Sequence, residues 1–470
     1  MMRVHARRTG EGLGVSVAAL LPLLAALLLQ WGCRDGGVAP PPPRPPNIVL
    51  YIVDTLRSDG LASYGNPSAS TPHFDRLAAE GVVFENAYAN ASWTRASIAT
   101  IVTGLYPSRH LAERRADSLP DEVETLSEVL LRNGYTTGLI TTNPNAGRHF
   151  GFDVGFDSMI ELYRRNKPGR VHSFELITAS DRVTDRAMEW IGAVPEPFFL
   201  TIVSVDPHAP YRPPERFDRA AGAYTGSADG SFEHIDRPDL DATDRRRIRA
   251  LYDAEVSFND DSFGALLAHL DELGIRDDTI VALTSDHGEE FWEIKGRRGH
   301  GRSLSEAVTR VPLVVRYPRG GRVPAGKRVA APVELADVVP TILDLAALPV
   351  PAGLDGRALF SGEPDPARAV YASLDLDGYR IRSLRKGPWK LLWYEPMNRF
   401  ELFRLDEPGG EERPIPQNAG PQARRARSEL KRELAAIVAR DAARVEAPEG
   451  QPEAVPADVE DAMRALGYIE

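Results

Sequence analysis

Runs of mostly apolar residues recur along the first two thirds of this chain. Their hydrophobicity is continuous instead of alternating, which is typical of strands that are buried on both faces of a sheet. We therefore predict strands at residues 47–53, 135–141, 198–204, 279–285 and 311–316.

Helical patterns fall between these runs and produce a βαβ rhythm. Such a rhythm predicts an α/β domain with a mainly parallel sheet sandwiched by helices. We place this domain at residues 47–360, and we interpret the Pro-, Gly- and Asp-rich stretch 208–240 as a long loop that covers a functional site. The predicted helices are residues 94–103, 123–133, 178–192, 244–273 and 335–346.

After about residue 360 the pattern changes to short, partly alternating strands at turn-sized intervals. This pattern predicts a smaller antiparallel β-subdomain, followed by a charged helix at 422–444. We assign residues 361–444 to this subdomain and residues 445–470 to a linker and a short terminal helix.

The first 46 residues differ again. Three arginines precede an apolar run at 15–29, and Cys33 directly follows a glycine. These features are typical of a secretory signal, and the Gly-Cys pair resembles a bacterial lipoprotein signal. We predict a signal at 1–33 with lipidation at Cys33 and a Pro-rich linker at 34–46. The protein should then be exported, either periplasmic or anchored in the outer membrane; an uncleaved membrane anchor is the alternative.

Composition narrows the possible partners. With 43% hydrophobic and 26% charged residues, the chain of 470 residues has the make-up of an ordinary globular protein. Its 56 basic and 67 acidic residues give a net charge of −11, whereas nucleic-acid binding favours a basic stripe. We expect no nucleic-acid partner. The single cysteine excludes an intramolecular disulfide.

Acidic residues stand where two predicted strands end. Asp54 follows the first run, and Asp286 follows the run at 279–285, with His287 next in sequence. Open α/β sheets bind ligands at the carboxyl ends of their strands, and an imidazole beside carboxylates suits a transition metal. The alternative for each aspartate is that it caps a helix or turn.

Several motifs resemble the sulfatase branch of the alkaline phosphatase superfamily and occur in the order found there. The resemblance covers about residues 47–410 and implies a metal-dependent hydrolase of the same α/β fold. The motifs are Asn47-Ile-Val-Leu with Asp54, Thr71-Pro-His-Phe, Thr103-Gly-Leu-Tyr-Pro, Asp206-Pro-His-Ala-Pro-Tyr, Asp286-His-Gly-Glu and Arg310-Val-Pro-Leu-Val.

One position departs from that family in a way that changes the expected chemistry. Where sulfatases carry the Cys or Ser that is oxidised to formylglycine, this chain has Thr94. A secondary alcohol cannot give the required aldehyde, so the site resembles the Thr-nucleophile members of the superfamily. Thr94 also starts a predicted helix, where it could act as an N-cap and where the helix dipole favours an anion.

The resemblance implies a metal held by Asp54, Thr94, Asp286 and His287. Many calcium-binding members have two consecutive aspartates at the first strand end, where this chain has Thr55 after Asp54. Fewer oxygen ligands and an added imidazole favour one Mn²⁺ or Zn²⁺ ion, with Ca²⁺ as the alternative.

Other residues are candidates for substrate contacts. His208 and His300 follow core strands and are expected to bind the substrate and assist the leaving group, while Arg95 could bind an oxygen of the transferred group. A second metal held by Asp206, His208 and His300 is a further alternative. Glu289 and Glu290 have a simple interpretation as solvated loop acids.

These expectations combine into a hydrolase of phosphate, phosphonate or sulfate esters. Thr94 would attack with the help of the metal, form a covalent ester and be regenerated by water. The substrate would be a small molecule or a glycan or lipid ester. The alternatives are a true sulfuric ester hydrolase, a group transferase and an inactive metal-binding surface protein.

Overall fold

The computed structural model describes residues 44–163, 179–219, 222, 224–442 and 454–469. The chain divides into two units, Met1–Arg44 and Pro45–Glu470, and every described helix and strand belongs to the second. The predicted signal, Cys33 and linker residues 34–43 lie outside the described residues. Within the described ranges, no helix is both long enough and apolar enough to cross a bilayer.

An eight-stranded sheet forms the centre of this unit, in the order β12-β2-β11-β7-β1-β6-β4-β5. Only β11 runs against its neighbours, since it pairs antiparallel with both β7 and β2. The predicted α/β fold with a mainly parallel sheet is therefore confirmed. The strands are β1 (Asn47–Val53), β2 (Val82–Phe84), β4 (Thr136–Thr141), β5 (Ser158–Glu161), β6 (Phe198–Ser204), β7 (Thr279–Ser285), β11 (Leu313–Arg316) and β12 (Lys327–Val329).

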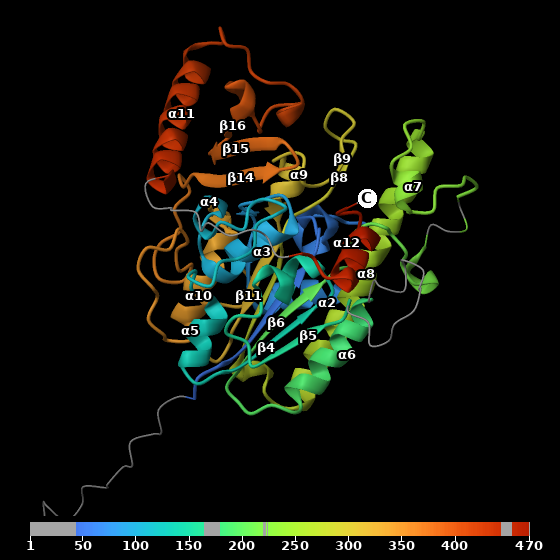
Figure 1. The fold of residues 1–470 in the computed structure, drawn as a ribbon, viewed down its shortest axis with the longest axis vertical. Helices are drawn as coiled ribbons and strands as arrows, with labels where there is room; N and C mark the ends of the chain where they lie inside the picture. The colour runs from blue at the N-terminus through green and yellow to red at the C-terminus, as the bar shows by residue number, and fades with distance from the viewer. Residues whose placement is uncertain (1–43, 164–178, 220–221, 223, 443–453, 470) are drawn as a thin grey trace, which may run out of the picture. The chain divides into compact units, whose positions relative to one another are not determined.

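Helices cover both faces of the sheet, and Figure 1 shows α6 and α8 on one side of the strands and α5 and α10 on the other. Alternate residues of β1 point into the two layers, as the pleat of a strand requires. One layer contains α2 (Pro72–Glu80), α6 (Ser180–Ile191) and α8 (Ala242–Glu272). The other contains α3 (Thr94–Thr103), α5 (Leu126–Arg132), α10 (Val338–Leu345) and α12 (Ala457–Ala465).

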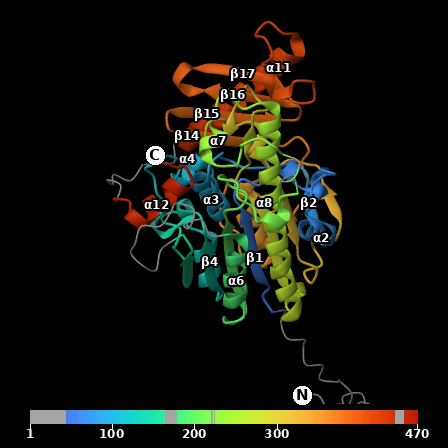
Figure 2. The ribbon, with the colours of Figure 1, turned by 90° about the vertical axis from the view of Figure 1, so that its right-hand side faces the viewer.

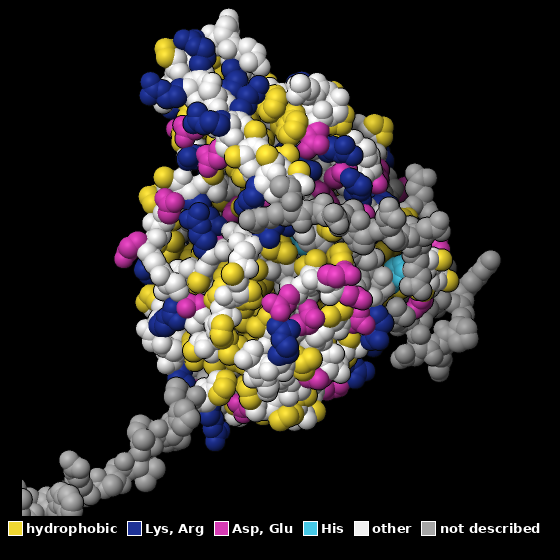
Figure 3. Space-filling model, turned by 60° about the vertical axis from the view of Figure 1, so that its left-hand side comes forward, with side chains coloured by type: hydrophobic (Ala, Val, Ile, Leu, Met, Phe, Trp, Pro, Cys, Tyr) yellow, Lys and Arg dark blue, Asp and Glu magenta, His cyan; other side chains and the backbone are white. Residues whose placement is uncertain are grey.

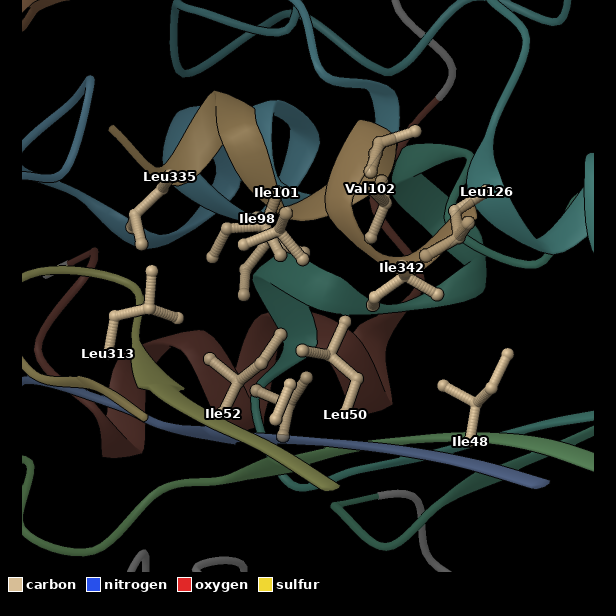
Figure 4. Packing of buried hydrophobic residues seen from close by; sticks show 14 of the residues in the cluster. Ile48, Leu50, Ile52, Ile98, Ile101, Val102, Leu126, Leu313, Leu335 and Ile342 are labelled. Atoms are coloured by element: carbon tan, nitrogen blue, oxygen red, sulfur yellow. The ribbon is translucent and has the colours of Figure 1, made fainter. Parts of the chain in front are cut away.

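The layer that contains α3 is packed by aliphatic side chains. Figure 4 shows Ile48, Leu50 and Ile52 of β1 facing the branched side chains of the helices above them. Continuous apolar residues on β1 are needed because both of its faces are buried.

A separate antiparallel sheet follows in the chain, in the order β14-β15-β16-β17, as predicted. Helix α11 (Pro421–Ala442) packs on this sheet, and Figure 3 shows Lys and Arg side chains gathered at the top of the molecule, where α11 lies in Figures 1 and 2. The strands are β14 (Val370–Leu376), β15 (Tyr379–Lys386), β16 (Trp389–Tyr394) and β17 (Arg399–Arg404).

Apart from β11, which was predicted at 311–316, elements of two to four residues were not predicted, because such short pieces carry little periodicity. The stretch 208–240 is a loop as expected, apart from a short 3-10 turn and the short helix α7 in its described part. The short elements are β3 (Ala87–Tyr88), β8 (Glu290–Phe291), β9 (Arg298–Gly299), β10 (Arg310–Val311), β13 (Val333–Glu334), α4 (Pro107–His110), α7 (Phe232–Ile235) and α9 (Glu306–Thr309).

The buried layer gives a test of the fold. Leu50→Ala should lower the free energy of unfolding by about 2–5 kcal/mol, because it leaves a cavity in a packed core. Denaturant unfolding measures this loss. Leu131→Ala on α5 is the matched control, since Leu131 is 38% exposed whereas Leu50 is fully buried. Equal losses in the two variants would contradict the packing described here.

Candidate active site

Parallel strands that end at the same level bring the predicted metal ligands together. Val53, the last residue of β1, lies opposite Ser204 of β6 and Ser285 of β7, so Asp54 and Asp286 leave the sheet side by side. His287 Nε2 lies 3.9 Å from Asp54 Oδ1 and 3.4 Å from Asp286 Oδ2. Among the described residues, these three form the one cluster of His, Cys, Asp and Glu with the spacing of a metal site.

The chemistry of this cluster fits a divalent cation. Asp54 Oδ1 and Asp286 Oδ2 are buried without a hydrogen-bond partner. Burial raises the pKa of Asp54, and the nearby charge of Asp286 raises it further, so a cation would relieve an unfavourable pair of buried charges. Burial also lowers the pKa of His287 to about 4, which keeps its imidazole neutral. Two carboxylate oxygens and one neutral nitrogen form a ligand set that suits a divalent cation.

The backbone beside the cluster is strained. Thr55 has φ of +56°, a region that β-branched residues rarely adopt. Its N–H donates to Asp286 Oδ1 at 3.2 Å, and its carbonyl accepts from the Tyr252 hydroxyl at 2.9 Å. This conformation connects the end of β1 to the Asp286 carboxylate, and strain of this kind concentrates at functional sites.

Thr94 lies at the cluster as the first residue of α3. The N-cap of α3 is Trp93, and no side chain caps the helix, so the N-cap alternative for Thr94 is wrong. Its Oγ1 lies 3.4 Å from His287 Nε2 and 3.4 Å from Asn143 Nδ2. The nucleophile candidate therefore stands at a helix N-terminus, where the dipole favours a developing alkoxide.

His208 and His300 lie beside this cluster. The ring centre of His300 lies 4.4 Å from that of His287 and 5.0 Å from that of His208. Burial lowers the pKa values of both His208 and His300 to about 4. Nδ1 of His208 faces the carbonyl of Ala209, so its buried Nε2, which has no protein partner, carries the lone pair.

Glu289 and Glu290 are not solvated loop acids, and this interpretation is wrong. Both carboxyl groups are buried. Glu289 Oε1 pairs with His300 Nδ1 at 3.0 Å, and its Oε2 accepts from the Tyr211 hydroxyl at 3.3 Å. Glu289 therefore orients the imidazole of His300. Glu290 accepts hydrogen bonds from Arg297, Ser303 and Ser305.

The structure does not support a second metal at Asp206. Asp206 Oδ2 accepts from the backbone N–H of Ser180 at 2.8 Å and from its hydroxyl at 2.6 Å. These bonds tie the carboxylate to the start of α6, and Asp206 joins no metal-like cluster with His208 and His300 among the residues described.

Arg95 also differs from its predicted role. Its Nη1 donates to the carbonyls of Arg115 and Asp117 at 2.6 and 2.7 Å, and its Nη2 donates to Asn145 Oδ1 at 2.8 Å. The guanidinium also lies 3.3 Å from the ring centre of Phe150. Arg95 therefore holds loops together through three of its N–H groups, while its Nε has no protein partner.

Two residues of the site were missed in the sequence. Asn143 follows β4, and its Nδ2 lies 2.5 Å from Asp54 Oδ2; its position just after a core strand was the signal that could have revealed it. Tyr468 belongs to the segment after α12, and its hydroxyl lies 2.8 Å from Thr94 Oγ1. Nothing in its local sequence indicates this contact.

A pocket of about 150 Å³ lies beside the site, and neither Thr94 nor the three metal-ligand candidates line it. His208, His300, Glu289 and Tyr468 form part of its wall, together with Arg298 and Arg302. Asp236, Glu289 and Glu290 also line this pocket, and Arg298 pairs with Asp236 at 2.8 Å, so its lining carries charges of both signs.

Metal binding can be tested through stability. Mn²⁺ or Zn²⁺ should raise the melting temperature, because a ligand of the native state stabilises it by about 2.7 kcal/mol at 100 times its Kd. Asp286→Asn should lose this shift in thermal unfolding assays, and should remain as stable in chelator because one of two repelling charges is gone. Asp121→Asn, at an exposed position, is the control. A full metal-induced shift in Asp286→Asn would disprove the site.

The chain is similar in sequence to a known sulfatase. The ulvan-active sulfatase of Formosa agariphila is 27% identical over 362 residues, which cover 69% of this chain and 66% of that protein. This chain thus spans just under two thirds of that relative.

Solved structures share the fold. One, of a protein in complex with its substrate D-glucosamine-2-N,6-O-disulfate, has a TM-score of 0.73 at 20% identity and covers 87% of this chain and 100% of that chain. Phosphonate monoester hydrolase of Agrobacterium radiobacter has a TM-score of 0.68 at 22% identity, with coverage of 84% and 96%. The family model described as Sulfatase matches residues 46–348, more than half of the chain. The protein therefore belongs to the sulfatase family of hydrolases, within the alkaline phosphatase superfamily.

Proposed function

We propose that this protein is a metal-dependent hydrolase of phosphate or phosphonate esters that uses Thr94 as its nucleophile. The observation that carries the proposal is the position of Thr94 Oγ1, 3.4 Å from His287 Nε2 beside two buried carboxylates and at the start of α3. The alcohol is thus held next to the groups that would bind the cation.

Different residues would bind the cation and supply the nucleophile. A cation bound by Asp54, Asp286 and His287 would lower the pKa of the Thr94 hydroxyl and offset negative charge on the transferred group. Thr94 Oγ1 attacks phosphorus, the bond to the leaving-group oxygen breaks, and an ester of Thr94 forms. Water then attacks this ester and releases Thr94.

The neutral histidines handle the proton. The lone pair on Nε2 of His208 can accept the proton that Thr94 loses and return it to the leaving-group oxygen. His300, held by Glu289, faces the same pocket and can activate the water of the second step. Burial lowers the pKa of both imidazoles, so both are uncharged at neutral pH and have a lone pair that can accept a proton.

A sulfate ester is the second candidate substrate, and membership of the sulfatase family favours it. Against it stands Thr94 itself. A formylglycine hydrate expels sulfate by elimination, whereas a sulfated threonine has no such exit. Whether the substrate is a phosphorus ester or a sulfate ester, the ester group would belong to a small molecule, a glycan or a lipid.

We also propose that the protein is exported as a lipoprotein, which rests on the pattern of residues 1–33. Signal cleavage before Cys33 would leave a mature chain that begins with a lipidated cysteine. Mass spectrometry of protein from cell envelopes should find this N-terminus, and Cys33→Ser should release the protein from membranes. A mature N-terminus elsewhere would refute lipidation at Cys33.

Kinetics on four nitrophenyl esters tests the reaction: a phosphate, a phosphodiester, a phosphonate and a sulfate. We expect the phosphorus esters to react faster than the sulfate. Thr94→Ala should lower kcat by on the order of 10³-fold or more, because the covalent route is lost. Thr103→Ala, at the other end of α3, should keep nearly full activity. Full metal-dependent turnover by Thr94→Ala would refute the nucleophile, and preference for the sulfate would favour the second candidate.

A further inference from the structure

The nucleophile candidate is hydrogen-bonded to a residue far along the chain. The Tyr468 hydroxyl lies 2.8 Å from Thr94 Oγ1 and accepts a hydrogen bond from Asn143 Nδ2 at 2.9 Å. Its ring centre lies 5.4 Å from that of His208 and 6.2 Å from that of His300. Tyr468 therefore lies next to Thr94, His208 and His300. These are the three residues, apart from the cation ligands, to which the proposed function gives a role in the chemical step.

Residues 454–469, here named the α12 segment, are docked firmly enough to hold Tyr468 in place. Figures 1 and 2 show α12 beside the sheet, next to elements from the first third of the chain. Val459, Ala462 and Met463 are at most 3% exposed and join the apolar cluster that also contains β1 and α3. The helix therefore belongs to the core layer behind the site.

Two contacts orient the end of the segment. Arg115 donates a hydrogen bond to the carbonyl of Tyr468. Gly467 has φ of +72°, and a Cβ there would lie 2.7 Å from the ring of Phe232, so only glycine fits this close turn. The turn directs Tyr468 inward from the end of α12.

This placement separates the pocket from the reacting groups. Thr94, Asn143 and the three metal-ligand candidates are all 0% exposed, and none of them lines the pocket. Tyr468 lines the pocket and also bonds to Thr94. An ester that enters past His208 and His300 meets the phenol ring before it meets the nucleophile.

The phenol oxygen also takes space that the substrate needs. A phosphoryl group bonded to Thr94 brings its own oxygens closer to Oγ1 than the 2.8 Å at which the Tyr468 hydroxyl lies. The same distance excludes Tyr468 as an in-line acceptor, because attacking and leaving oxygens must lie on opposite sides of phosphorus. The hydroxyl therefore occupies space beside Thr94 Oγ1 that the oxygens of a bound phosphoryl group would require.

We propose that the α12 segment is an intramolecular inhibitor whose Tyr468 side chain occupies the binding position of the transferred phosphoryl group. Substrate then binds only when this side chain moves out of that position. This inference rests on the proposed function, since Thr94 defines the binding position of the phosphoryl group. If the open form is about 1–10% populated, the apparent affinity for substrate falls about 10–100-fold. The segment thereby sets the basal activity of the enzyme.

The experiment compares full-length variants with Mn²⁺ or Zn²⁺ present. Tyr468→Ala removes the blocking side chain, Tyr468→Phe removes only the hydroxyl, and Met463→Asp weakens the docking of α12. Asp461→Asn, on the exposed side of α12, is the matched control. Calorimetry measures binding of inorganic phosphate, which needs no turnover, and the phosphorus-ester assay measures kcat/KM.

Tyr468→Ala and Met463→Asp should bind phosphate about 10-fold tighter or more and raise kcat/KM by a similar factor. Tyr468→Phe should show a smaller gain, and Asp461→Asn none. Equal or weaker phosphate binding by Tyr468→Ala would overturn the inhibitor, and a fall in kcat for Tyr468→Phe would instead make the phenol a catalytic donor. Tyr468→Ala keeps α12 docked, so it decides the question if Met463→Asp fails to fold.

Other results would separate a failure of the proposed function from a failure of the proposed inhibitor. If the variants bind phosphate more tightly but no variant cleaves any ester, the α12 segment blocks an anion site that lacks the proposed chemistry. If Thr94→Ala abolishes turnover while Tyr468→Ala changes neither constant, the function stands and the inhibitor is wrong.

Discussion

The electrostatic cost of two neighbouring buried carboxylates is the constraint on which this site depends. Asp54 and Asp286 are both fully buried, and each has an oxygen without a protein partner. Such a pair is costly unless a cation or protons neutralise it. The remaining contacts limit that cost without removing it, because Asn143 donates to Asp54 while the N–H groups of Thr55 and His287 donate to Asp286. The fold keeps an unbalanced charge where a cation would balance it.

The sheet makes this arrangement rigid. The strands β1, β6 and β7 pair in parallel and end at one level, and packed side chains on both faces prevent them from sliding. The start of α3 is fixed from the same layer, because every residue of this helix is buried. A nucleophile on such a helix needs little rearrangement to reach its electrophile, which is the advantage of a preorganised site. Glu289 extends the same principle to His300.

The α12 segment adds regulation to this rigid site. It contributes core side chains to the layer behind α3 and a polar side chain to the nucleophile. One face of the segment belongs to the core and the other lines the pocket. Docking of the segment can therefore control the access of substrate to Thr94.

The sequence by itself determined the mainly parallel α/β fold, the C-terminal antiparallel sheet, and the convergence of Asp54, Thr94, Asp286 and His287. Local patterns account for the parallel sheet and for Asp54, Asp286 and His287, since continuous apolar runs specify buried parallel strands and such strands place their end residues at one edge. Thr94 was placed at the site by the resemblance of its motif to the sulfatases, because it begins a helix and ends no strand. Only the tertiary structure decided the roles of Arg95, Glu289 and Tyr468. Arg95 turned out to bind loop carbonyls, Glu289 is buried against His300, and Tyr468 arrives at Thr94 from 374 positions away. Their roles depend on which distant groups pack around them, and no local pattern of residues encodes that.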